Sequence, residues 1–99
     1  MTQDRWVAEV RIVRENIPDF RPFIKNGYCG FVGYINRHRV QVQAPVRDYP
    51  AVEPKLYIEG ATAHTYADGS ICSHRVWRPE RSTFANCILI AMKYAETWL

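Results

Sequence analysis

The chain has 99 residues, of which 47% are hydrophobic and 23% are charged, and its formal net charge is +3. This length suits one domain over residues 1–99, and the composition excludes a disordered or collagen-like chain. No apolar run of about 18 residues is present, which excludes a membrane-spanning helix. The arginines are scattered along the chain, which disfavours a nucleic-acid partner.

The N-terminal segment, residues 3–17, carries apolar side chains at helical spacing. An alternating strand pattern competes over the same residues. Because the segment contains no Gly or Pro and is long for a strand, we predict an amphipathic helix that ends at Pro18. Residues 19–27 are then expected to form a connecting loop. The charged N-terminus lacks the apolar stretch of a signal peptide, so we expect the chain to stay in the cytoplasm.

Three segments are predicted to be strands of one antiparallel sheet. Residues 28–35 are rich in aromatic and β-branched side chains, residues 40–44 alternate between apolar and polar, and residues 55–58 form a short third strand. The polar residues 36–39 predict a turn that joins the first two strands into a hairpin. Residues 60–79 form a long loop, and such loops inside a compact domain are often functional.

The last predicted element is a helix over residues 82–98. Ser82 or Thr83 is a suitable N-cap residue. The first three turns are apolar on most of their circumference, which predicts that the helix is buried against a sheet or a partner. The order of helix, strands, long loop and helix is typical of an α+β domain.

The three cysteines, Cys29, Cys72 and Cys87, are an odd number, which argues against a disulfide framework in a cytosolic chain. Cys29 and Cys87 fall in apolar elements and are expected in the core. Cys72 lies in the long loop, where three interpretations compete: a small apolar filler, a metal ligand together with His64 and His74, or a nucleophile assisted by a histidine. No paired cysteines support the metal interpretation, so we expect no metal.

Five segments share the order and the near spacing of motifs in a known family. They are residues 40–50, residues 54–58, His64, Gly69-Ser70-Ile71-Cys72 and Trp77-Arg78-Pro79. They resemble, in turn, a strand with a Pro-x-x-Tyr-Pro turn (here one residue longer), a Pro-led strand, the start of a His-Pro-Asn tripeptide, a Gly-x-Ile-Cys segment and a Trp-x-Pro segment. The chain therefore resembles the ubiquitin-conjugating enzyme family, and within it the short bacterial relatives.

The resemblance implies an α+β fold in which a three- or four-stranded antiparallel meander packs on helices, without the family's C-terminal helices. It implies that Cys72 is the active-site cysteine, which accepts a protein C-terminus as a thioester and transfers it to an amine. It also implies that His64 mainly braces the active-site loop. The other loop residues that it places at the site are Tyr66, Asp68, Gly69 and Trp77.

The tripeptide itself departs from the family pattern. It is His64-Thr65-Tyr66 and lacks the asparagine that the family uses near the oxyanion, and the spacing to Cys72 is shorter than usual. His74, two residues after Cys72, is the best candidate to assist the thiol. The departures leave two alternatives open: a catalytically inactive binding or scaffold module and, ranked last, a small cysteine hydrolase.

Thioester transfer requires no metal or nucleotide cofactor, and the chain contains no Gly-rich phosphate-binding loop. The resemblance implies a ubiquitin-like protein or a nucleotide-cyclase C-terminus as the thioester donor, with a separate adenylating enzyme, in a bacterial conjugation or anti-phage pathway. No nucleic acid or membrane is expected as a partner. Without the family's C-terminal helices, the last helix keeps exposed faces that allow a homodimer.

Overall fold

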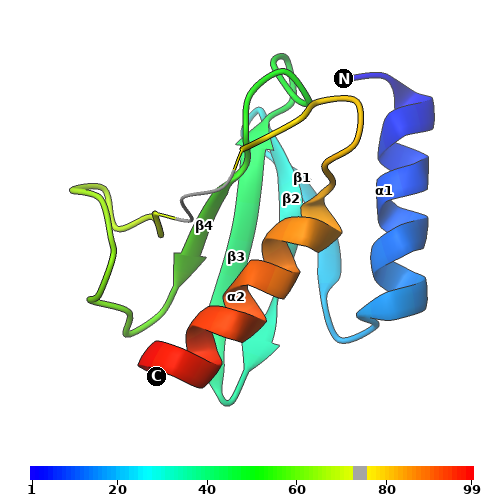
Figure 1. The fold of residues 1–99 in the computed structure, drawn as a ribbon. Helices are drawn as coiled ribbons and strands as arrows, with labels where there is room; N and C mark the ends of the chain where they lie inside the picture. Colours follow the sequence, from blue (N-terminus) through cyan, green and yellow to red (C-terminus); the bar gives the residue numbers. More distant parts are fainter. Residues whose placement is uncertain (73–75) are drawn as a thin grey trace.

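The computed structural model describes residues 1–72 and 76–99, and these ranges contain two helices and four strands (Figure 1). In chain order they are α1 (Gln3–Asn16), β1 (Arg21–Lys25), β2 (Tyr28–Ile35), β3 (His38–Pro45), β4 (Lys55–Ile58) and α2 (Phe84–Trp98). The strands form one antiparallel sheet in the order β1-β2-β3-β4, so each pairs with the next along the chain. The predicted α+β class and antiparallel meander are confirmed.

The core lies between the sheet and α2, which crosses one face of the sheet (Figure 1). Strand residues that alternate in sequence point to this face, so Phe31 on β2 and Val42 on β3 are fully buried. Phe84 at the start of α2 packs against Phe31 with ring centroids 5.4 Å apart. Trp6 of α1 contacts both rings, at 5.4 and 6.1 Å, and thereby joins the first helix to the core.

Both helices begin at residues that the sequence favours for capping. The Thr2 side chain accepts a hydrogen bond from the backbone of Arg5 at the start of α1. Thr83, one of the two predicted N-caps, forms a capping box with Asn86 at the start of α2. Side chain and backbone of the two residues exchange hydrogen bonds, so the first turn of α2 is locally fixed.

Strand β1 corrects our prediction that residues 19–27 form only a loop. It is an edge strand that pairs with β2 from Arg21 opposite Val32 to Lys25 opposite Tyr28. The middle residue of β1 is half-buried and the other four residues are exposed, so the segment lacks a clear apolar alternation. Its second residue, Pro22, is tolerated because an edge strand need not donate from every backbone nitrogen.

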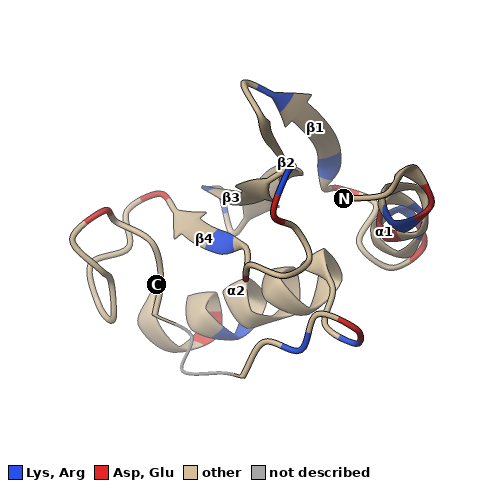
Figure 2. Cartoon of the chain, turned by 90° about the horizontal axis from the view of Figure 1, so that it is seen from above, with Lys and Arg blue, Asp and Glu red and all other residues tan. Residues whose placement is uncertain are grey.

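Basic and acidic residues are spread over α1, the strands and the loops, without a dense block of either sign in the described ranges (Figure 2). Neither helix within residues 1–72 and 76–99 has both the length and the apolar character needed to cross a bilayer.

Candidate active-site hairpin

The residues around Cys72 form a small hairpin, residues 64–72, inside the long loop. Thr65 and Ile71 make an isolated antiparallel bridge. On one side of this bridge the Cys72 nitrogen donates to the His64 carbonyl oxygen at 2.7 Å. The Ile71 nitrogen donates to the carbonyl oxygen of Leu56 on β4, also at 2.7 Å. The hairpin is therefore attached to the edge of the sheet, which places Cys72 next to the core.

The tip of the hairpin is a turn held by Asp68 and Gly69. Gly69 has a φ of +88°, a conformation that favours glycine, and its nitrogen donates to the Tyr66 carbonyl oxygen at 2.9 Å. Asp68 Oδ1 accepts from the nitrogen and the hydroxyl of Ser70, at 2.9 and 2.6 Å. Its other oxygen, Oδ2, lies 2.6 Å from Lys55 Nζ on β4. The hydrogen bonds from Lys55 and Ser70 hold the pKa of Asp68 well below its usual range.

Tyr66 is brought to the side of Cys72 by the hairpin. The backbone hydrogen bond from Tyr66 to Ser70, at 2.8 Å, and the bridge beyond it set the register. In this register Tyr66 and Cys72 are diagonal neighbours on one face. A side-chain interaction with Cys72 raises the pKa of Tyr66. The phenol therefore keeps its proton at neutral pH and can donate it toward the sulfur of Cys72, which is half-buried.

Two hollows flank the hairpin. A groove of about 600 Å³ lies between β4, the hairpin and α2, and Tyr66 borders it. A second hollow, of about 360 Å³, lies between the hairpin and the C-terminal half of α2, and Cys72 lines it. The walls of the second hollow are His64, Ile71, Ile90, Lys93, Tyr94, Thr97 and Trp98. The thiol thus faces a space in which a second molecule or a side chain can approach it.

His64 connects the hairpin to the end of α2. Its φ is +53°, and its ring lies edge-on to Trp98 with centroids 4.6 Å apart. Together with the hydrogen bond from Cys72 to its carbonyl oxygen, this contact places His64 between the cysteine and the helix. The geometry suits the bracing role that the family resemblance implies for His64.

Trp77 lies on the segment that follows the hairpin. Its indole nitrogen donates to the Pro50 carbonyl oxygen at 2.6 Å, and its ring lies 5.9 Å from that of the buried Tyr49. Tyr49 in turn stacks on Phe84 at 4.5 Å. This chain of contacts joins the loop after β3 to the start of α2 and fixes the segment around Trp77.

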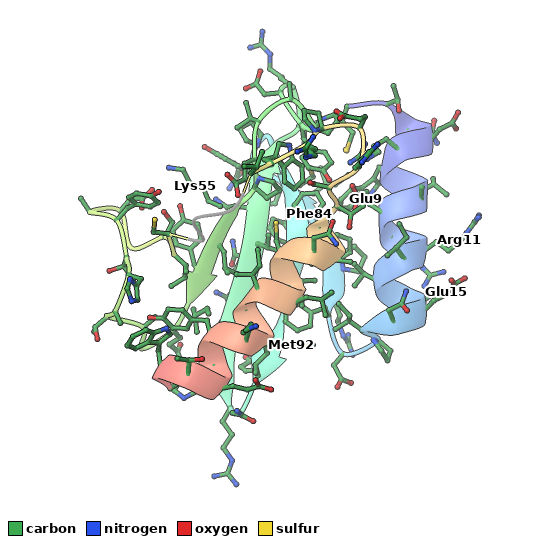
Figure 3. All side chains as sticks on the ribbon, viewed as in Figure 1. Glu9, Arg11, Glu15, Lys55, Phe84 and Met92 are labelled. Carbon is green, nitrogen blue, oxygen red and sulfur yellow. The ribbon has the colours of Figure 1, made fainter. Side chains whose placement is uncertain are left out.

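Glu9 is an important side chain that our sequence analysis missed. It is 1% exposed, and Figure 3 shows it on the side of α1 that faces Phe84. Its carboxylate accepts from Arg5 Nε at 2.9 Å, from the Phe84 nitrogen at 3.0 Å and from the Tyr49 hydroxyl. Arg5 also donates to the carbonyl oxygens of Pro79 and Ser82, at 2.9 and 2.7 Å. The four-residue spacing of Arg5 and Glu9 on a helix was the available signal.

The remaining sequence predictions concern two cysteines expected in the core, His74 and a possible metal site. Cys29 is fully buried, with its sulfur 3.6 Å from the Ala44 carbonyl oxygen, and Cys87 is 3% exposed. Both therefore lie in the core, as predicted. His74 lies outside the described residues. Within residues 1–72 and 76–99, no three His, Cys, Asp or Glu side chains come close enough together to hold a metal ion.

Comparison with known proteins finds no matching family model, no matching curated protein and no matching solved structure.

Proposed function

We propose that the chain is a ubiquitin-conjugating-like carrier protein, which holds a protein C-terminus as a thioester on Cys72 and transfers it to an amine. The observation that carries the proposal is the hairpin itself, which anchors Cys72 at the edge of the sheet beside a hollow and makes Tyr66 its diagonal neighbour on the same face. Tyr66 occupies the third position of the tripeptide, where the family has its asparagine. The order of helix, four-stranded meander, cysteine loop and helix also supports the proposal.

The proposed reaction has two steps. In the first, the Cys72 thiolate attacks the carbonyl carbon of an activated C-terminus, a carbon–sulfur bond forms, and the activating group leaves. In the second, a neutral amine attacks the same carbon, a carbon–nitrogen bond forms, the sulfur leaves as a thiolate, and the extra proton on nitrogen passes to solvent. The Tyr66 hydroxyl supplies a hydrogen bond where negative charge develops, first on the carbonyl oxygen and then on the departing sulfur. Thiolate is a good leaving group, so the second step needs no further activation.

The activating partner follows from this chemistry. A carboxyl group must be activated before a thiol can take it, so a separate adenylating enzyme is the proposed source. The family resemblance, rather than the chemistry, implies a ubiquitin-like protein or the C-terminus of a nucleotide cyclase as the donor, in a bacterial conjugation or anti-phage pathway. The groove of about 600 Å³ that Tyr66 borders has room for an extended C-terminal segment of the donor.

The test is whether Cys72 carries a covalently attached protein when the chain is purified from the cells that encode it. Tagged wild-type protein, Cys72→Ser and Cys72→Ala are purified after an acid quench and separated with and without dithiothreitol. We expect a wild-type adduct that the thiol removes and a Cys72→Ser adduct that the thiol leaves intact, because serine forms an oxygen ester. Cys72→Ala should carry no adduct. Equal adducts in Cys72→Ala, or none in the other two proteins, would show that this domain only binds or scaffolds.

A further inference from the structure

We propose that Lys93 is an acceptor built into the chain: once Cys72 carries an acyl group, the Lys93 amine takes that group in cis. The protein then modifies its own helix α2. This inference rests on the proposed carrier function and adds to it a specific modification site.

The hollow of about 360 Å³ brings the two nucleophiles together. Cys72 lines it from the hairpin and Lys93 from the third turn of α2. Most of the remaining wall is apolar, including Ile71 and Ile90. Cys72 is half-buried and Lys93 is exposed, so the lysine amine can approach the hollow from solvent while Cys72 lines it from the hairpin.

Two contacts hold the hairpin and the helix in place on either side of the hollow. The Tyr94 hydroxyl donates to the Ala63 carbonyl oxygen at 2.5 Å. The His64 ring lies edge-on to Trp98 at 4.6 Å. Because these contacts come from the residues next to the hairpin and next to Lys93, the distance that the lysine must span is limited. An amine held beside the reacting carbon has a large advantage over an amine that arrives from solution.

The other two lysines of the chain are placed differently. Lys55 Nζ lies 2.6 Å from Asp68 Oδ2 at the tip of the hairpin, and Lys55 does not line the hollow that Cys72 borders. Lys25 lies on β1, at the edge of the sheet opposite β4, to which the hairpin is attached. Lys93 is therefore the lysine that shares a hollow with Cys72, and Lys25 is a matched control.

The chemistry balances without a further reactant. The neutral Lys93 amine attacks the carbonyl carbon of the thioester, and a carbon–nitrogen bond forms. The carbon–sulfur bond breaks, and its electron pair leaves with Cys72 as a thiolate. The extra proton on nitrogen passes to solvent, and the product is an isopeptide bond on α2.

A small thioester probe tests this step without the natural partner. The full chain is incubated with the mercaptoethanesulfonate thioester of fluorescein-labelled glycine, which can load Cys72 by thiol exchange. Label that dithiothreitol removes reports the thioester, and label that survives reports the amide, whose position is read by peptide mass spectrometry. We expect amide on Lys93, formed at a rate independent of protein concentration. Lys93→Arg should reduce it about tenfold or more, whereas Lys25→Arg should leave it unchanged.

Three other outcomes would overturn the inference. If Cys72 is loaded but Lys93→Arg makes as much amide as Lys25→Arg, Lys93 is not the acceptor, and the carrier function stands. If Cys72→Ala acquires the Lys93 amide at the wild-type rate, the lysine reacts directly and the transfer step is wrong. If the wild type acquires no thiol-labile label on Cys72, the carrier function fails together with the inference.

Discussion

The three cysteines are expected to differ in thiol reactivity because they differ in burial. Cys29 is fully buried, and burial raises its pKa to about 11. Since the usual value is 9.0, the thiolate fraction of Cys29 at neutral pH is lowered about a hundredfold. Cys87 is 3% exposed in α2, whereas Cys72 is half-buried and borders a hollow. Access therefore favours Cys72, and the raised pKa of Cys29 further lowers the reactivity of that thiol.

We therefore expect iodoacetamide at pH 7.5 to alkylate Cys72 first in the folded protein. Cys29 and Cys87 should react only after denaturation. The measurement is peptide mass spectrometry over a time course, with protein in urea as the control for intrinsic reactivity. Alkylation of Cys29 at a rate equal to that of Cys72 would contradict the assignment of the nucleophile.

The Tyr66 hydroxyl is the second group whose role can be isolated. Tyr66→Phe removes the hydroxyl beside Cys72 and keeps the ring, so the fold should persist. We expect loading of Cys72 by a thioester probe to slow by about tenfold to a hundredfold, because a donor to the developing charge is lost. Tyr34→Phe is a matched control, since Tyr34 is 65% exposed on β2. Loading at the same rate in both variants would leave Tyr66 without a chemical role.

At the scale of elements, Glu9 links α1 to the start of α2. Removing one partner of a buried ion pair leaves the other without compensation, which is strongly destabilising. We expect Glu9→Ala to lower the free energy of unfolding by about 3 kcal/mol. Urea denaturation measures this, and Glu15→Ala is the control, because Glu15 points away from the molecule on the same helix (Figure 3). Equal urea midpoints for Glu9→Ala and Glu15→Ala would show that the Glu9 contacts contribute little to the stability of the fold.

The elements that were predictable from the sequence are those with a clear periodicity. Strand β2 and strand β4 have the predicted bounds, and α2 begins one or two residues after the predicted N-cap. Strand β1 was missed because its pairing with β2, rather than an apolar pattern, defines it. The candidate cysteine came from local motifs. Its contact with Tyr66 and the hollow shared with Lys93 depend on how the hairpin folds against α2, which no local pattern records.

At the scale of the whole molecule, the buried thiol of Cys29 makes the free energy of unfolding decrease at alkaline pH. Its folded pKa, about 11, is above the usual value of 9.0, so the folded state binds this proton more tightly. The resulting stability is complete below pH 9 and is lost as the pH rises toward 11. We expect urea midpoints to fall across this window. Cys29→Ala should be less stable throughout but should show a shallower fall, and an unchanged slope would contradict the role of Cys29.

The proposed thioester on Cys72 is tested most directly by a lysine at that position. Thioesters are labile to amines and thiols, whereas an amide at the same place is stable. Cys72→Lys, coexpressed with its neighbouring genes, should accumulate a thiol-resistant adduct in which mass spectrometry finds a protein C-terminus joined to the introduced lysine. Cys72→Arg, which keeps the charge but cannot form this bond, should accumulate none. An adduct absent from Cys72→Lys, or equal in the two variants, would contradict the carrier function.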